Sequence, residues 1–428
     1  MQTLIAVFTG RHLRILQADM YHISNSSVRG SVMFPFEGIV VLDFTRGYPG
    51  SHASMFLGDF GADVIRVDPP PGATPRGDMD QETLAAFQTV HRNKKSIIIN
   101  LKSEDGQEVL RKLVKKADVL VEGFRPGVMD RLGAGYEDLK KINPRLVYCS
   151  LSGFGQDGPY VDRPAHDMNY ISLGGVLSLI GPRNGPPYLP SNVVADFGGA
   201  AMHGITGILI ALFAREKTGR GQFVDISYLD SVISLLSQET PNYFLTGQVP
   251  RRGETRLTGA HPWTNVYKCK DGEYITIACI EPQFWDTLCK ELNREDLIKY
   301  QREPFTQEEL DDVTAQLAEI FITRTHDEWT KFFEGKEVCF GPVNYLDETF
   351  QDPQVLHRKM VVELEHPRAG KVRQIGLSIK LSDTPGKIRS LGTPNGANTG
   401  EIMRQLGYGE EEIKELLSSG AVTQTGSD

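Results

Sequence analysis

Three ionisable side chains stand at the predicted ends of helices and strands rather than on apolar faces. His166 begins one predicted helix, Asp196 begins a long apolar one, and Glu281 follows an apolar strand. An imidazole and a carboxylate that face one cleft can remove and return a proton. Free N–H groups in the first turn of a helix can stabilise the negative charge that develops meanwhile. These residues are therefore our candidates for acid–base chemistry.

Each of the three residues also has a purely structural interpretation. Asp is a favoured helix N-cap, so Asp196 can serve only to begin its helix. A single His is more often a hydrogen-bonded structural residue, and a Glu that precedes Pro is usually a solvated loop acid. Residue type and position alone leave both interpretations open.

Other motifs for catalysis or cofactor binding are weak in this sequence. Residues 153–158 match G-x-G-x-x-G after a strand, but Pro159 follows and no helical pattern begins there, so no dinucleotide site is predicted. The five cysteines stand apart, without a C-x-x-C pair or clustered histidines. This predicts neither a disulfide framework nor a metal site, and it fits a reducing compartment.

Length and composition limit the class of protein. A chain of 428 residues exceeds the roughly 250 that one core usually holds, so two or three domains are expected. With 46 basic and 55 acidic residues, the net charge of −9 gives no global attraction to nucleic acid. The longest uninterrupted apolar run, residues 208–214, is too short to span a bilayer. We therefore expect no nucleic-acid or membrane partner, and any anionic ligand must be held locally.

The first 35 residues differ in composition from the rest of the chain. They carry Arg11, Arg14 and Arg29, several Ser, and only Asp19 as an acid, which is typical of a mitochondrial transit peptide. An alternative start or a frayed tail is the other interpretation. The C-terminus lacks the S-K-L peroxisomal signal. The expected location is mitochondrial or peroxisomal, with residues 1–35 as an N-terminal extension.

The remaining sequence predicts an α/β architecture. Buried strands are predicted at residues 39–44, 62–67, 96–101, 119–121 and 146–150, with helices between them at 51–60, 103–117 and near 136–142. Such alternation indicates a large, doubly wound parallel-sheet (Rossmann-like) domain, which we assign to residues 36–235. A linker is predicted at 236–260, a smaller α+β domain at 261–346, and a return of residues 347–428 to the large domain.

Several motifs resemble those of one enzyme family. AHDMNYISLGGVL at 165–177, VADFGG at 194–199 and IEPQF at 280–284 are similar to stretches of the racemases that act on α-methylacyl-CoA thioesters. These racemases belong to the class III CoA-transferase (CaiB/BaiF-like) family. The wider family pattern appears in GDFGADVIRV at 58–67, RNKKS at 92–96, EGFRPGV at 122–128 and TGRGQ at 218–222. The resemblance extends over residues 36–417, with the motifs in the family order.

The resemblance implies roles for the three candidate residues. His166 and Asp196 would be acid–base groups on opposite faces of the α-carbon of a 2-methylacyl-CoA, and Glu281 would orient the imidazole of His166. The reaction would invert the centre through an enolate, with no cofactor because CoA is part of the substrate. The family also implies an intertwined homodimer whose active site lies between the large domain of one chain and the small domain of the other.

The resemblance also implies a CoA-binding surface. At one position of this surface, the sequence differs from that of the racemases. Basic contacts would come from Arg92, Lys94, Lys95, Lys102, Arg125 and Arg131, and further contacts from Ile98, Ile99, Asn100 and Leu101 and from Ala165, Asp167, Met168, Asn169 and Tyr170. The racemases carry an Arg after the Val-Asp of their second strand, where this sequence has Pro69. That phosphate contact is lost or moved, with Arg76 as one candidate.

Two other functions remain open at this point. In a CoA-transferase of the same family, the Asp196 carboxylate would be a nucleophile that forms a mixed anhydride and then an enzyme–CoA thioester. Phe87 and the segment 91–95 are closer to the transferases, whereas His166 and Glu281 favour the racemases. A non-catalytic CoA-binding protein is the third interpretation, and it leaves the three ionisable residues without a role.

Overall fold

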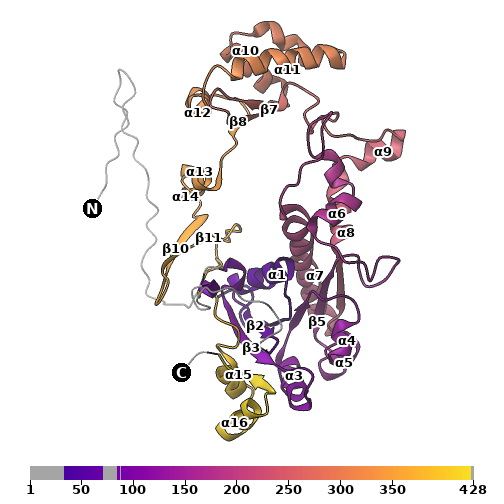
Figure 1. Cartoon of the computed structure of the whole chain (residues 1–428), viewed down its shortest axis with the longest axis vertical. Coiled ribbons are helices and arrows are strands. Elements are labelled where there is room, and N and C mark those ends of the chain that lie inside the picture. The colour runs from indigo at the N-terminus through magenta and orange to yellow at the C-terminus, as the bar shows by residue number, and fades with distance from the viewer. Residues whose placement is uncertain (1–32, 71–83, 87, 426–428) are drawn as a thin grey trace, which may run out of the picture. The chain divides into compact units, whose positions relative to one another are not determined.

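The computed structural model describes residues 33–70, 84–86 and 88–425 (Figure 1). The predicted extension 1–35 lies almost wholly outside this part of the chain, as do Arg76 and Phe87. Every element named below belongs to the unit formed by residues 34–428.

A seven-stranded sheet forms the centre of the large domain and confirms the α/β prediction. Its order is β12-β3-β2-β1-β4-β5-β6. All neighbours are parallel except β12, which runs antiparallel to β3. The strands are β1 (Val40–Asp43), β2 (Asp63–Asp68), β3 (Lys94–Ile99), β4 (Val119–Glu122), β5 (Val147–Ser152), β6 (Phe223–Ser227) and β12 (Val422–Thr423).

The chain order reverses between β1 and β4. From β1 the chain proceeds outward through β2 to β3, and then crosses to β4, β5 and β6 on the other side. In open parallel sheets, ligands bind at the carboxyl ends of the strands beside such a reversal. The loops after β1 and β4 are therefore placed to line a binding site.

Helices cover both faces of the sheet because strand residues alternate between them. Val41, Val64 and Val119 face α1 (Tyr48–Asp59) and α7 (Met202–Thr218), where they pack with Leu57 and Ile208. The alternate residues of the strands pack on the opposite face against α3 (Glu104–Lys116), α5 (Tyr136–Ile142), α15 (Thr399–Gln405) and α16 (Glu410–Ser418). The helices α1 and α7 can be followed beside the sheet in Figure 1.

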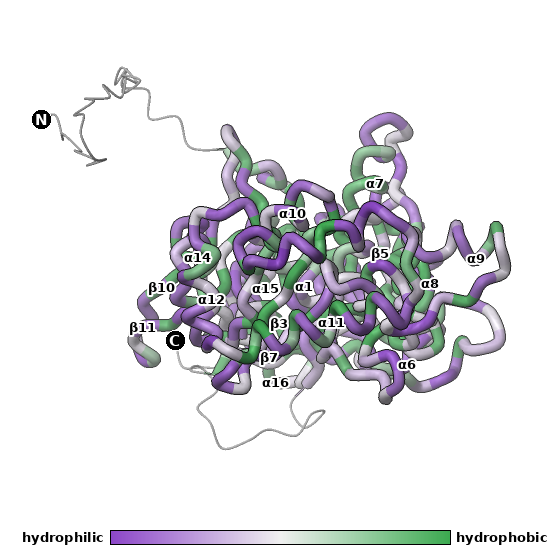
Figure 2. Tube along the Cα trace, turned by 90° about the horizontal axis from the view of Figure 1, so that it is seen from above, coloured by the Kyte–Doolittle hydropathy of each residue, from purple (hydrophilic) through white to green (hydrophobic). Residues whose placement is uncertain are grey.

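The long apolar helix begins earlier than predicted and with a different geometry. Residues Val193–Ala201 form a π-helix, η3, which continues directly into α7. Together they span 26 residues, and this is the one helix in the described part of the chain that is long and apolar enough to cross a membrane by length and composition. Its hydrophobic character is visible in Figure 2. Ala200, Ile208 and Ala211 are fully buried in the core, as in the central helix of a globular domain.

The family motif at 218–222 forms the tight connection from α7 to β6. Gly219 adopts the left-handed conformation, with φ of 72°, at the C-terminus of α7. A Cβ on Gly221 would lie 2.0 Å from the carbonyl oxygen of Leu146. Only glycine fits at that position, so the motif has a structural role here.

Between the two domains, part of the predicted linker is helical. The helices α6 (Asp167–Leu173) and α8 (Tyr228–Ser234) precede the predicted linker in the chain, and α9 (Thr240–Thr246) lies within residues 236–260, which were predicted as the linker. Phe244 and Leu245 on α9 are strongly exposed, at 78% and 85%.

The smaller domain is built on the antiparallel strands β7 (Thr264–Lys268), β8 (Tyr274–Ala278) and β9 (Phe340–Pro342). Its core centres on Trp263, Trp285 and Trp329. Three longer helices pack on this sheet, α10 (Pro282–Glu291), α11 (Gln307–Phe321) and α12 (His326–Phe333).

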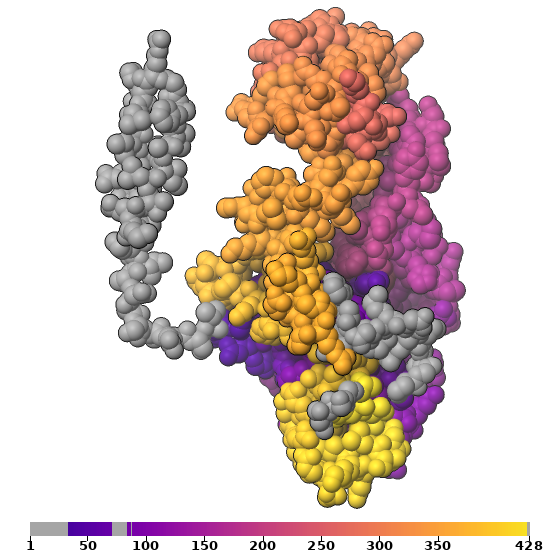
Figure 3. Space-filling model, turned by 60° about the vertical axis from the view of Figure 1, so that its left-hand side comes forward, coloured from indigo at the N-terminus to yellow at the C-terminus, as the bar shows by residue number. Residues whose placement is uncertain are grey.

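The chain then returns to the large sheet. It passes through α13 (Leu346–Thr349), α14 (Pro353–His357) and the hairpin of β10 (Val361–His366) and β11 (Gly370–Ile375). Arg66 Nη2 on β2 donates to Asn395 Oδ1 at 2.8 Å, and β12 pairs with β3. The C-terminal residues, yellow in Figure 3, lie against the early strands and helices of the large domain.

Candidate functional site

Asp167 joins the two helix starts that carry His166 and Asp196. His166 is the N-cap of α6, and Asp196 lies in the first turn of η3. The Oδ2 atom of Asp167 accepts the backbone N–H groups of Ala195 and Asp196 at 2.8 and 2.9 Å. Because Asp167 directly follows His166, this contact joins the two helix starts that carry the imidazole and the carboxylate.

The electrostatic environment of Asp196 also reflects this proximity. Burial is the largest influence and raises the pKa of Asp196 above its ordinary value. A hydrogen bond from the Asn192 amide, at 3.1 Å to Oδ2, lowers this pKa, the charge of Asp167 raises it, and His166 lowers it. A carboxyl group with a raised pKa is better suited to return a proton than an ordinary surface aspartate.

One oxygen of Asp167 has no partner. Its Oδ1 atom is buried and forms no hydrogen bond with the described residues. The residue is only 6% exposed. The Oδ2 atom of this buried carboxylate therefore accepts the two N–H groups of η3, and its Oδ1 atom can accept a hydrogen bond from a ligand or water.

The remaining residues of the α6 start have structural and surface positions. The side chain of Asn169 accepts the His166 N–H at 3.0 Å, and the Tyr170 hydroxyl donates to the carbonyl of Ala165 at 3.0 Å. Met168 is exposed. The imidazole of His166 is thus presented at an open surface at the start of α6.

Glu281 does not join this pair within one chain. It is exposed at the N-cap of α10 in the small domain, and no hydrogen bond or ion pair with His166 is recorded among the described residues. The structure of one chain therefore does not test the predicted pairing of Glu281 with His166.

Lys94 is placed differently from the CoA-contact prediction. Its Nζ lies 2.8 Å from Asp43 Oδ2, the Ser51 carbonyl and Ser54 Oγ, and its side chain is 1% exposed. The pKa of Asp43 is lowered to about 2 because, although burial opposes ionisation, the charge and hydrogen bond of Lys94 outweigh it. All three donors of the ammonium are used, so Lys94 is not free to bind a phosphate.

Arg92 is likewise used within the protein. Its Nε and Nη2 atoms bind both carboxylate oxygens of Asp59, at 3.0 and 2.6 Å, and Nη1 donates to the carbonyl of Ile375. This two-pronged contact joins α1 to β11. Arg92 therefore forms part of a cavity wall rather than a free phosphate contact.

The other predicted CoA contacts differ in accessibility. Lys102, Arg125 and Arg131 are exposed, and Lys95 is half-buried between Asp63 and Glu401. Ile98 and Ile99 are buried, and Ile98 pairs with both β2 and β12, whereas Ile99 pairs with β12. The accessible candidates on this edge are the loop residues Asn100, Leu101 and Lys102.

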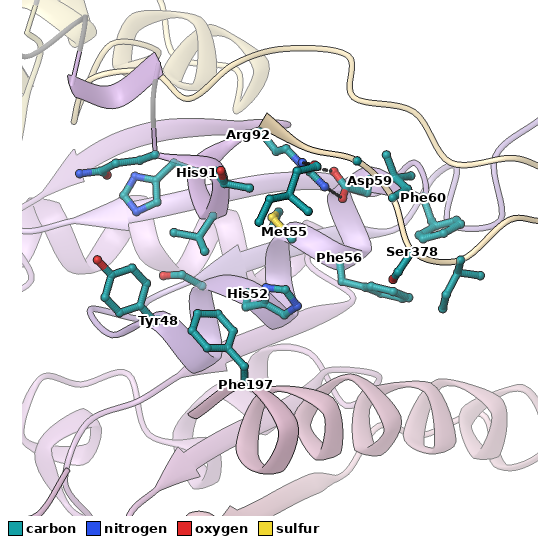
Figure 4. A pocket seen from close by; sticks show the side chains of 18 of the residues that line it. Tyr48, His52, Met55, Phe56, Asp59, Phe60, His91, Arg92, Phe197 and Ser378 are labelled. Atoms are coloured by element: carbon teal, nitrogen blue, oxygen red, sulfur yellow. Dashed lines mark hydrogen bonds and ion pairs between the residues drawn. The ribbon is translucent and has the colours of Figure 1, made fainter. Parts of the chain in front are cut away.

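A large cavity adjoins η3 and was not predicted from the sequence. It has a volume of about 840 Å³ and lies between α1, η1 (Thr89–His91), the start of η3 and residues 375–379 (Figure 4). Its lining includes Val193 and Phe197, which flank Asp196 along the helix. The remaining lining is mostly apolar, with Tyr48, Met55, Phe56, Phe60, Val90, Met360, Leu377 and Ile379.

Three polar residues at this cavity were also missed. Arg46 donates to the carbonyls of Thr45 and Val67 at the carboxyl ends of β1 and β2, and it borders the cavity with His52 and His91. The only signal available in the sequence was their position in or near loops that follow strands of a parallel sheet.

A second, smaller cavity contains a buried carboxyl group at the end of β4. It has a volume of about 340 Å³ and is lined by Glu122, Arg125 and Gln156, among others. Burial raises the pKa of Glu122 to about 7, although hydrogen bonds from Ser150 and the Phe124 N–H oppose the change. Glu122 thus anchors the loop that presents Arg125.

Comparisons with known proteins place these features in a family context. The model of CoA-transferase family III matches residues 36–399. The chain is 34% identical over 428 residues to succinyl-CoA:glutarate CoA-transferase of Homo sapiens, covering 98% of this chain and 93% of that protein. It is 35% identical over 383 residues to alpha-methylacyl-CoA racemase of Homo sapiens, covering 89% of this chain and 96% of that protein.

A solved structure is also similar. The crystal structure of a CAIB/BAIF family protein from Brucella suis has a TM-score of 0.72 and 29% sequence identity. The match covers 87% of this chain and 99% of that one. The similarity therefore extends over both the large and the small domains.

Proposed function

Because the chain belongs to CoA-transferase family III, we propose that it is a racemase that interconverts the (R) and (S) forms of 2-methylacyl-CoA thioesters. The observation that carries the proposal is the joined pair of helix starts, in which Asp167 holds His166 beside Asp196. A CoA-transferase needs only the carboxylate, whereas a two-base racemase needs both groups.

The reaction requires one proton transfer on each face of the α-carbon. One of the two groups removes the α-proton, the electron pair moves into the thioester carbonyl, and the other group delivers a proton to the opposite face. In the first turn of α6, the N–H groups of Asp167 and Met168 have no acceptor among the described residues, and they are available to the enolate oxygen. Removal by His166 and return by Asp196 gives one direction, and the opposite assignment gives the reverse.

The CoA part would extend along the carboxyl ends of the strands. Lys102, Arg125 and Arg131 are exposed and can meet its phosphates. Arg46 adds a guanidinium beside Asp68, 3.8 Å from its Oδ1, next to the position where Pro69 replaces the arginine of the racemases. We assign the missing phosphate contact to Arg46, and no separate cofactor is required.

The active enzyme would be a homodimer, because no hydrogen bond or ion pair joins Glu281 to His166 among the described residues of one chain. Large apolar side chains on α7 and α9 are exposed, including Phe213 at 67% and Leu245 at 85%. A second copy of the chain would cover them and supply Glu281 to the imidazole. Sedimentation should give twice the mass of one chain, and a monomer with full activity would contradict this assembly.

A CoA-transferase is the second candidate, and the 34% identity to succinyl-CoA:glutarate CoA-transferase over 98% of the chain supports it. In that reaction the Asp196 carboxylate attacks the thioester and CoA passes to an added carboxylate. His166 would then have no proton to transfer at the α-carbon.

Incubation in deuterated water separates the two candidates. With one enantiomer of a 2-methylacyl-CoA, we expect deuterium at the α-carbon, measured by mass spectrometry, together with loss of optical purity. Transfer of CoA to succinate or glutarate without α-exchange would contradict the racemase and establish the transferase.

A further inference from the structure

His52 presents an imidazole to the cavity beside Asp196. It lies on α1, and the edge of its ring packs against Phe197 with a centroid distance of 5.2 Å and an interplanar angle of 89°. Figure 4 shows the ring between Phe197 and Met55. No hydrogen bond to the ring is recorded among the described residues. The cavity therefore contains a hydrogen-bonding group with no partner in the described part of the chain.

The surroundings of that group are largely apolar. Met55, Phe56 and Phe60 line the same cavity from α1, and Leu377 and Ile379 line it too. His52 is half-buried, so its ring can meet water, and a ligand that displaces this water has to supply another partner. An oxygen acceptor supplies one, whereas an alkyl chain does not.

The charges around His52 determine which partner is favoured. Burial, followed by the positive charges of Arg92 and Lys94, lowers the pKa of His52 to about 4. The ring is therefore neutral at neutral pH and carries one N–H donor. The same cations favour an electron-rich atom nearby. An oxygen acceptor, either neutral or anionic, fits this environment better than a donor or a cation.

The position of the cavity identifies which part of the substrate enters it. Val193 and Phe197 line it, and both lie within three residues of Asp196 on η3. A group attached to the carbon that Asp196 protonates can thus extend directly past Phe197 to His52. Of the basic candidates for CoA, Lys102, Arg125 and Arg131 follow β3 and β4, and Arg46 borders the cavity at the ends of β1 and β2.

From this geometry we propose that His52 determines substrate specificity, by selecting acyl-CoA thioesters whose acyl chain carries an oxygen acceptor beyond the α-carbon. The acceptor is a hydroxyl, carbonyl or carboxylate oxygen that receives the imidazole N–H, while the rest of the chain packs on the apolar wall. This inference rests on the proposed racemase function, since it places the α-carbon at Asp196.

The test compares two 2-methylacyl-CoA esters of equal length, one with a terminal carboxylate and one with a terminal methyl group. The wild-type dimer should exchange the α-proton of the carboxylate ester with a kcat/KM about tenfold higher, the size of one net hydrogen bond. His52→Phe should abolish this preference while exchange of the methyl ester continues. His52→Gln, which retains an N–H donor, should restore part of it, and His357→Phe, at an exposed histidine outside the cavity, should leave it unchanged.

Calorimetric binding of both esters provides a readout that does not depend on turnover. If the wild type binds the carboxylate ester more tightly than the methyl ester and His52→Phe does not, the result supports the inference. This holds even if no α-exchange occurs, and in that case only the proposed racemase function is contradicted. Equal binding of the two esters by the wild type would overturn the inference. If His52→Phe weakened the binding of both esters equally, the inference would also be overturned. That result would show that His52 contacts the CoA part common to both esters or only stabilises the fold.

Discussion

At the scale of single residues, partners far along the chain decide what a charged side chain does. Lys94 and Lys102 look alike in the sequence, yet Lys94 is buried against Asp43 and Ser54 while Lys102 is exposed. Asp43 lies 51 residues before Lys94, so no local sequence pattern predicts their ion pair. The candidate residues His166 and Asp196 were recognised because motifs identify them, whereas His52 has no such motif.

Glu122 gives a residue-scale prediction for stability against pH. Its pKa of about 7 in the folded protein exceeds the ordinary value of 4.5, with burial as the main cause. The folded state therefore binds more protons than the unfolded state between these two values, so stability falls as the pH rises through this window. At pH 8 the buried charge costs up to about 3 kcal/mol.

Replacement by an uncharged amide removes this cost. Glu122→Gln should raise the thermal midpoint relative to the wild type at pH 8, and the difference should shrink towards pH 5. The exposed Glu104→Gln serves as the control and should show no such pH dependence. A Glu122→Gln difference that is the same at both pH values would show that the carboxyl group does not titrate in this range.

At the scale of elements, apolar runs identified the parallel strands, and the fold class followed. The run at 39–44 predicted β1, observed at Val40–Asp43, because a strand buried on both faces is nearly continuously apolar. The π-helix η3 and the short strand β12 were missed. A π-helix depends on packing against Asp167 and α1, and β12 is a two-residue strand that exists only through its pairing with β3.

The junction of α6 with η3 gives an element-scale prediction. Asp167→Ala leaves the N–H groups of Ala195 and Asp196 without their acceptor, which should destabilise the protein by about 2 kcal/mol. Because Asp196 would no longer be held beside His166, kcat for α-exchange should fall more than tenfold with little change in KM. Asp167→Asn, whose amide oxygen can still accept, should recover most of the thermal midpoint and part of kcat.

A structural role without positioning would give a different result for these variants. If Asp167→Ala lowered the thermal midpoint but left kcat unchanged at a temperature where it remains folded, Asp167 would contribute only to stability. An unchanged midpoint would contradict the contact itself.

At the scale of the whole molecule, the candidate residues are divided between two domains, and the chain has exposed apolar side chains. The pair His166 and Asp196 lies in the large domain and Glu281 in the small one, and no hydrogen bond or ion pair joins Glu281 to His166 among the described residues. Phe244 and Leu245 on α9 are exposed, in a segment predicted as a linker. The sequence of one chain does not show which surface of a second chain would cover these residues. The homodimer therefore stays a proposal.

The most direct measurement of the central claim follows deuterium incorporation into each pure enantiomer separately, using His166→Gln and Asp196→Asn. The account predicts that each variant exchanges the α-proton of one enantiomer roughly 100-fold or more slowly than the wild type does. The enantiomer whose exchange is slowed should be the (R) form in one variant and the (S) form in the other. Loss of exchange from the same enantiomer in both variants, or full exchange of both enantiomers in either one, would contradict a mechanism with one acid–base group on each face of the α-carbon.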